Sequence, residues 1–366
     1  MIKLSHKISE ISPSMTLAIS AKANEMKANG EKVISFGVGE PDFNTPEHIV
    51  RAAKDALDKG YTKYVAASGL PALKKAIANK LKRENGLDYD PSQIVVCNGG
   101  KHAIYNAMFA VLEEGDEVLI PKPYWLTYPE VVMCCGGVPV YIYATPRHGY
   151  KVTAAQIEAM ITPHTKMLIL NSPCNPTGAV YTEEEIRAIA DVCVRHNIVV
   201  LSDEMYEKLI YGGEKQFSIA SVSPEMKELT IIVNGVSKSY AMTGWRLGFV
   251  AAPKHVAKAI GSFQSHTTSN VNTITQYAAI AAYEGDQKPM EDMVKAFGER
   301  RKKMLEVLES MKPLGLDYVK PDGAFYVMLL CYNLYGKSYE GVKINGSMDF
   351  CEMLLTHEKV AATPGI

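Results

Sequence analysis

Two cations stand close together in the segment 234–246: Lys238 and, eight positions later, Arg246. The preceding run 230–234 is apolar and β-branched, which is typical of a short buried strand. Lys238 would then emerge at the carboxyl end of that strand, where open α/β sheets keep their ligands. A lysine amine forms an imine with an aldehyde, and a guanidinium holds a phosphate by its planar fork. The pair indicates an anchor for a phosphorylated aldehyde, although a surface lysine with a solvated arginine remains the alternative for so short a motif.

Two earlier strand ends carry groups of the same kind. Asn98, Gly99, Gly100 and Lys101 follow the apolar run 94–97 and open a helical pattern. The glycines let backbone N–H groups approach a phosphate at a helix amino end, while a plain tight turn is equally consistent with this motif alone.

Trp125 follows the run 118–120, and its indole can stack on a heteroaromatic ring or simply be a buried aromatic.

The next two strand ends add an amide, a carboxylate and a phenol. Asn175 lies in the loop 171–178, which is rich in turn-forming residues, and its amide can donate to a phenolate oxygen. Asp203 and Tyr206 follow the run 198–202. A buried carboxylate beside a pyridine nitrogen keeps that nitrogen protonated and makes the ring an electron sink, whereas the alternative role for Asp203 is a helix N-cap. Taken together and in this order, these groups are what pyridoxal phosphate requires.

The elements that must position these groups alternate along the chain. Such alternation predicts an α/β fold, with a mostly parallel sheet between helices. We expect strands at 94–97, 118–120, 138–143, 167–170, 198–202, 230–233 and 247–251, and helices at 103–112, 155–160, 183–196 and 254–263. The large cofactor-binding domain would span 47–289. Residues 1–46, an amino-terminal arm with a helical stretch at 17–28, would pair with 290–366 as a smaller α+β domain.

Composition excludes several classes of protein. The 366 residues are 47% hydrophobic and 22% charged with a formal net charge of −1, so no polybasic surface for nucleic acid is indicated. No apolar run approaches the roughly 20 residues that span a bilayer, and the amino end lacks a secretory apolar segment, which favours a cytoplasmic location. The seven scattered cysteines predict neither a disulfide framework nor a metal site.

With these motifs in place, nearly the whole chain, from segment 37–43 to segment 360–365, resembles the fold-type I pyridoxal-phosphate-dependent aminotransferases of class I/II, and most of all their bacterial aspartate aminotransferase subgroup. The resemblance implies the PLP-dependent transferase fold. It also implies that Lys238 is the Schiff-base lysine and proton shuttle, and that Asp203 pairs with the pyridinium. By the same resemblance Tyr206 and Asn175 would bind the phenolic oxygen, and Trp125 would stack on the ring.

The resemblance extends to the phosphate and to assembly. Residues at positions where the family surrounds the phosphate are Gly100, Lys101, Ser237 and Arg246. Gly235 departs from the pattern, because relatives often carry a serine there. Tyr64 matches a tyrosine that family members extend into the neighbouring subunit's phosphate site, so the resemblance implies a homodimer with shared active sites.

For the substrate, the resemblance assigns Gly39, Trp125 and Asn175 to the amino acid, and Thr16 and Lys101 to the side-chain carboxylate of an acidic substrate. This favours aspartate with 2-oxoglutarate and ping-pong kinetics, although Lys101 is also consistent with a solvated lysine or a phosphate neighbour. The alternatives are an aromatic or prephenate aminotransferase, a C–S lyase of the same fold, or a non-catalytic cofactor-binding regulator.

The carboxyl end raises one further expectation. Relatives place an arginine that grips the substrate α-carboxylate in a strand beyond the motif Pro364-Gly365, and the sequence stops at Ile366. A small domain ending there would be incomplete and would recognise the substrate carboxylate poorly, unless the protein continues.

Overall fold

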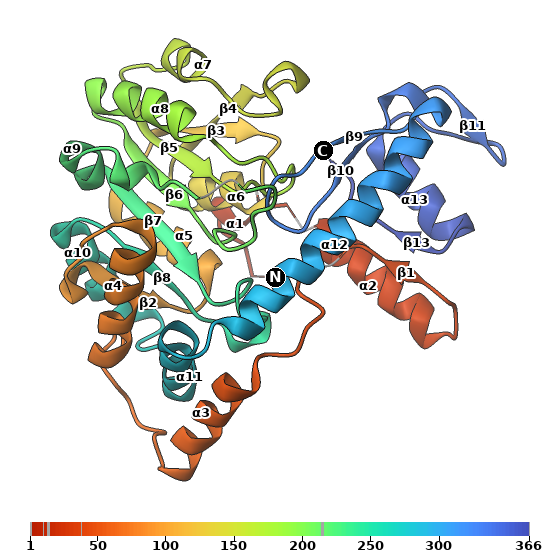
Figure 1. Ribbon diagram of the computed structural model, residues 1–366. Coiled ribbons are helices and arrows are strands. Elements are labelled where there is room, and N and C mark those ends of the chain that lie inside the picture. The colour runs from red at the N-terminus through yellow and green to blue at the C-terminus, as the bar shows by residue number, and fades with distance from the viewer. Residues whose placement is uncertain (1, 10, 13–14, 38, 214–215, 366) are drawn as a thin grey trace.

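A seven-stranded sheet organises the larger part of the molecule in the computed structural model, which describes residues 2–9, 11–12, 15–37, 39–213 and 216–365 (Figure 1). In spatial order its strands are β2 (Ile94–Cys97), β8 (Gly248–Ala251), β7 (Thr230–Gly235), β6 (Val199–Asp203), β5 (Thr165–Asn171), β3 (Glu117–Lys122) and β4 (Val138–Tyr143). Neighbours from β7 to β4 are parallel, whereas β8 runs antiparallel to both β7 and β2. The predicted α/β fold with a mostly parallel sheet is confirmed.

Helices cover both faces of this sheet because its strands are apolar on both sides. In β5, Leu168 and Leu170 face one layer, and Met167 and Ile169 face the other. The first layer contains α3 (Glu47–Asp58), α4 (Pro71–Asn85), α7 (Ala154–Ala159), α8 (Glu183–Arg195), α9 (Pro224–Glu228) and α11 (Thr273–Glu284). The second contains α5 (Gly100–Val111), α6 (Thr127–Cys134) and α10 (Lys254–Thr267).

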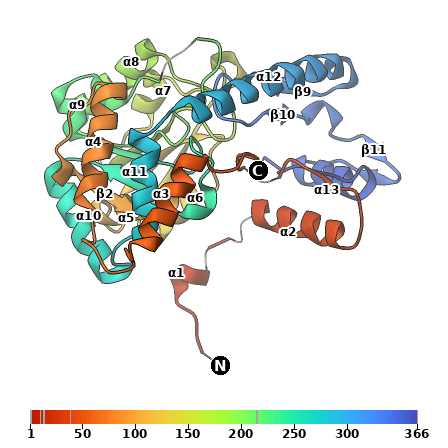
Figure 2. The same cartoon turned by 60° about the horizontal axis from the view of Figure 1, so that its bottom comes forward.

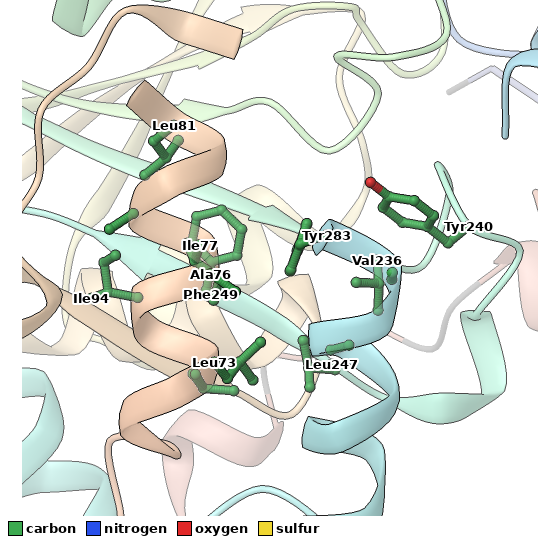
Figure 3. Close-up of a cluster of buried hydrophobic side chains, with 14 of the residues drawn as sticks. Leu73, Ala76, Ile77, Leu81, Ile94, Val236, Tyr240, Leu247, Phe249 and Tyr283 are labelled. Atoms are coloured by element: carbon green, nitrogen blue, oxygen red, sulfur yellow. The ribbon is translucent and has the colours of Figure 1, made fainter. Parts of the chain in front are cut away.

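The packing of α4 shows how sequence spacing becomes stability. Leu73, Ile77 and Leu81 recur every fourth residue, so they form one stripe that packs toward Phe249 of β8 and Tyr283 of α11 (Figure 3). The three aliphatic side chains are fully buried. Burial of each stabilises the fold by about 1.5–3 kcal/mol relative to exposure.

Segments from both ends of the chain pair beside the large sheet (Figures 1 and 2). Strand β1 (Ile34–Ser35) lies parallel to β13 (Val360–Ala361), and Ala23 of α2 packs with Leu355 of α13. The other elements of this region are two antiparallel pairs and three helices: β9 (Asp317–Val319) with β10 (Met328–Leu330), β11 (Ser338–Tyr339) with β12 (Val342–Lys343), α2 (Met15–Ala28), α12 (Lys288–Met311) and α13 (Ser347–His357). A short helix, α1 (His6–Ser9), precedes α2.

Most element boundaries differ from the sequence prediction by one or two residues, and two helix boundaries differ by more. The helix predicted from position 103 begins at Gly100, because Gly99 adopts the N-cap position with a φ of 85°, which apolar periodicity does not reveal. The helix predicted to end at 263 continues to Thr267, because Gln264 is buried and donates to backbone carbonyls of Ala67 and Val96. Within the described ranges, no helix has both the length and the apolar composition to cross a membrane.

Candidate active site

The carboxyl ends of β5, β6 and β7 bring the predicted polar groups to one edge of the sheet. Asn171, the last residue of β5, pairs in register with Asp203, the last residue of β6. The Asn171 amide donates to the Asp203 carbonyl at 3.0 Å, and its oxygen accepts from the backbone N–H of Asn175 at 2.7 Å. The loop that carries Asn175 is therefore tied directly to the turn that carries Asp203.

Asp203 is a buried carboxylate, with 5% of its surface exposed. Its Oδ2 accepts from the Tyr128 hydroxyl at 2.7 Å, and its Oδ1 accepts from the backbone N–H of Met205 at 3.1 Å. Burial raises the pKa of this carboxyl, against the opposing effects of these two donors and of the Lys238 charge. A buried carboxylate of this kind is stabilised by a cation, so the site suits a protonated ring nitrogen.

The turn after Asp203 is held to α4 by a buried ion pair. Lys80 is 1% exposed and pairs with Glu207, and it donates to Asn85 Oδ1 at 2.8 Å. Burial alone would raise the pKa of Glu207, but the Lys80 and Lys208 charges outweigh burial and hold that pKa below its usual range. Because Glu207 directly follows Tyr206, this pair ties the turn that carries Tyr206 to α4.

Lys238 points toward the amino-terminal segment. Its Nζ donates to the Gly39 carbonyl at 2.5 Å and lies 5.6 Å from the centre of the Phe325 ring. Burial lowers the pKa of this amine to about 8; Arg246 also lowers it, while Glu40 and Asp203 act in the opposite direction. A substantial fraction of the amine is therefore neutral, and so nucleophilic, near physiological pH.

Tyr206 meets a residue that the sequence reasoning missed. Its hydroxyl lies 2.5 Å from the hydroxyl of Tyr326, which comes from the segment between β9 and β10. Both phenols are largely buried, and burial is the main reason that their pKa values lie above the usual range. No local motif marks Tyr326, because a segment more than a hundred residues away in the chain brings it to the site.

Gly99 and Arg246 form a close pair at the amino end of α5. A Cβ atom at Gly99 would lie 2.3 Å from Arg246 Nη2, so the guanidinium occupies the space that a side chain would need. Arg246 Nη1 also donates to the Thr243 carbonyl at 2.8 Å. The guanidinium and the free N–H groups of a twelve-residue helix thus face the same region, an arrangement that suits a phosphate.

The glycine at 235 is explained by packing. A Cβ atom there would lie 2.8 Å from the Gly248 Cα and 2.8 Å from the Leu247 carbonyl oxygen of the adjoining strand. A serine hydroxyl at this position would therefore require the backbone to move. The neighbouring Ser237 is buried and keeps a hydroxyl in this turn.

Trp125 and Lys101 lie on the Tyr128 side of the site. The Trp125 ring meets the Tyr128 ring edge to face at 5.6 Å, and Lys101 Nζ lies 5.2 Å from the centre of the Trp125 ring. Partial burial is the larger cause that lowers the pKa of Lys101, and repulsion from the Arg246 charge is the smaller one. Tyr128 was also missed, because its role depends on the approach of Asp203 from a distant strand.

One predicted residue, Tyr64, is not brought into this cluster. Tyr64 is 89% exposed in this single chain. Thr16 lies in α2, and its side chain is outside the described structure. An open hollow of about 880 Å³ adjoins the cluster at Arg246, with Glu40, Asn98 and Asn272 also on its walls. This hollow lies beyond the guanidinium rather than around Lys238.

Comparison with known proteins gives consistent results. Residues 31–366 match the family aminotransferase class I and II. The aspartate aminotransferase of Geobacillus stearothermophilus is 49% identical over all of this chain and 91% of its own length. A probable aspartate/prephenate aminotransferase of Rhizobium leguminosarum bv. phaseoli is 46% identical over the same shares.

Solved structures of similar fold lead to the same family. The crystal structure of the aspartate aminotransferase from Rhizobium meliloti has a TM-score of 0.95 and 43% identity, covering 100% of this chain and 91% of that one. The aspartate aminotransferase from Thermus thermophilus with maleate has a TM-score of 0.92 and 40% identity, covering 100% and 92%.

The environment of Lys238 predicts its titration. Competitive labelling of the cofactor-free protein with an amine-reactive reagent, followed by peptide mapping, should give Lys238 a midpoint at about pH 8. The midpoint is low because desolvation disfavours the protonated form of the amine. The amine therefore loses its proton well below the ordinary lysine pKa of about 10.4. The same peptide labelled in denaturant is the control and should titrate near the ordinary value. Equal midpoints in the two samples would rule out the proposed environment.

Proposed function

Because this chain belongs to the class I and II aminotransferases, we propose that it is a pyridoxal-phosphate-dependent enzyme that exchanges an amino group between L-aspartate and 2-oxoglutarate. The observation that carries the chemistry is the buried Asp203 carboxylate at the same sheet edge as the pKa-lowered amine of Lys238. The choice of aspartate as the substrate is supported by the similarity to the aspartate aminotransferases described above. A cytoplasmic location stays a prediction from the sequence.

The residues present fit the implied cofactor. Lys238 offers an amine with a lowered pKa, and Asp203 offers a buried carboxylate that needs a cationic partner. Gly99 leaves room for the guanidinium of Arg246 at the amino end of α5, where an anion is favoured. These three features match an aldehyde, a pyridine nitrogen and a phosphate in turn. When bound, pyridoxal phosphate supplies an aldehyde that condenses with amino groups and a ring that delocalises the electron pair of a carbanion.

The residues of the chain would then share the work of proton transfer. Lys238 Nζ, neutral in a useful fraction, takes the α-proton of the amino acid as a general base and returns it as a general acid. Asp203 holds a proton on the ring nitrogen by its charge, while Tyr128 keeps the carboxylate oriented. Tyr206 and Asn175 offer donors to an anionic oxygen, and Trp125 covers the site on the Tyr128 side.

Two substrate classes have support. The relatives at 46–49% identity include aspartate aminotransferases and one probable aspartate/prephenate aminotransferase. Lys101 lies 5.2 Å from the centre of the Trp125 ring, on the edge of the cluster, where it suits a second carboxylate on the substrate. Prephenate also carries such a carboxylate, so it is the second candidate amino-group acceptor.

The test of this function is an amino-donor profile. With pyridoxal phosphate and 2-oxoglutarate, aspartate should react faster than alanine or phenylalanine, measured by keto-acid formation. Lys101→Ala should raise KM for aspartate by about 10-fold or more while changing phenylalanine little, because a charged hydrogen bond is lost only with the acidic donor. A wild-type preference for phenylalanine over aspartate would overturn the aspartate assignment.

We also propose that two chains form a homodimer with shared sites. Tyr64 is 89% exposed although it matches a phosphate-binding position of the family, so it is available to a second subunit. Phe109 of α5 is 46% exposed and stacks on Phe263 of α10 with ring centres 4.2 Å apart, which leaves apolar surface available for association.

Subunit mixing tests this assembly. Tyr64→Ala and Lys238→Ala chains, each nearly inactive alone, should regain about a quarter of wild-type activity after random co-assembly, because half of the dimers then hold one intact site. The control pair is Lys238→Ala with Asp203→Asn. Both of those residues belong to one chain's site, so no activity should return. Failure of the first pair to recover would show that Tyr64 serves its own chain.

A further inference from the structure

The hydroxyl of Tyr326 belongs to neither the predicted cluster nor the mechanism above, yet it is buried at the site. It lies 2.5 Å from the Tyr206 hydroxyl, and the two rings meet at 74° with centres 5.6 Å apart. It also lies against Gly39: a Cβ atom there would be 2.4 Å from the Tyr326 oxygen. Tyr326 therefore contacts both the amino-terminal segment that accepts from Lys238 and the phenol of Tyr206.

The segment that carries Tyr326 is held firmly on the large sheet unit. The N–H groups of Asp322 and Gly323 donate to the Gly178 carbonyl at 2.9 and 2.8 Å, and the N–H of Ala324 donates to the Leu209 carbonyl at 2.8 Å. Tyr211 adds a bond from its hydroxyl to the Ala324 carbonyl at 2.7 Å. The three backbone hydrogen bonds fix the segment just before Tyr326, so the position of its hydroxyl is set by the fold.

Two glycines make this close approach possible. A Cβ atom at Gly178, which has a φ of 70°, would lie 2.3 Å from the Pro321 Cβ. A Cβ atom at Gly323 would lie 2.6 Å from the Pro173 Cβ. The loop after β5, which carries Asn175, and the segment before Tyr326 are thus in direct backbone contact.

The hydroxyl pair also has a required direction. A phenol has one proton to donate. If Tyr206 donates its proton to an anionic oxygen in the site, as in the proposed function, its own oxygen can only accept from Tyr326. A donor of this kind polarises the Tyr206 hydroxyl and makes it a stronger donor in turn.

We propose that Tyr326 is a positioning residue that acts through Tyr206, by donating to its oxygen and so strengthening and orienting the bond that Tyr206 makes to the phenolic oxygen of the cofactor. This inference rests on the proposed function. It also explains the glycine at position 39, because a Cβ atom there would collide with the Tyr326 hydroxyl beside Lys238.

The test is the pH titration of the absorbance of bound pyridoxal phosphate in the holoenzyme. Tyr206→Phe should raise the midpoint, because its donor stabilises the phenolic oxygen anion that remains when the chromophore loses its proton. Tyr326→Phe should raise the midpoint in the same direction, by about 10–30% of that shift, as expected for a cooperative bond. In a Tyr206→Phe background, Tyr326→Phe should add nothing.

Tyr211→Phe is the matched control, because it also removes one phenol hydroxyl at the same segment, and that hydroxyl donates to the Ala324 carbonyl rather than to Tyr206. It should leave the midpoint unchanged. The affinity of the cofactor-free protein for pyridoxal phosphate should fall in Tyr326→Phe and stay unchanged in Tyr211→Phe.

Three outcomes would overturn the proposal: an unchanged midpoint in Tyr326→Phe, an equal shift in Tyr211→Phe, or a shift that persists in the Tyr206→Phe background. If the wild-type protein forms no chromophore with pyridoxal phosphate, the proposed function itself fails and this inference fails with it. That result is distinct from all three, because it is seen before any variant is made.

Discussion

The burial of one carboxylate constrains the whole site. Asp203 ends a central strand with 5% of its surface exposed, and a charge in that position is costly unless donors and a cation surround it. Tyr128 and the N–H of Met205 supply the donors. The buried ion pair between Lys80 and Glu207 ties the turn that follows Asp203 to α4.

The second requirement is close packing against the backbone, and glycines make it possible because they have no Cβ atom. Gly99 makes room for the Arg246 guanidinium, and Gly178 and Gly323 let the carboxy-terminal segment reach the loop after β5. Gly39 does the same for Tyr326. As a result, groups from the amino-terminal segment, the central sheet and the carboxy-terminal segment meet within hydrogen-bonding distance of Lys238 and Tyr206.

Much of this arrangement could be predicted from the sequence because its signal is local. Lys238 and Asp203 each follow an apolar run, and parallel strand ends meet at one edge of a sheet, so both the α/β fold and the juxtaposition of these residues were foreseeable. Tyr326 and Tyr128 were missed because their roles depend on tertiary approach rather than on the residues beside them. The extension of α10 was missed because a polar residue, Gln264, is buried there by hydrogen bonds that periodicity cannot show.

The central claim is that the Asp203 charge, held in a buried site, makes removal of the α-proton possible. The most direct measurement is the exchange of the aspartate α-proton with solvent deuterium, followed by NMR, in wild-type and Asp203→Asn holoenzymes that hold equal amounts of cofactor. The account predicts that exchange slows by about 10²-fold or more, because a preorganised charge is lost while the shape is kept. Exchange within a few fold of wild type would contradict it.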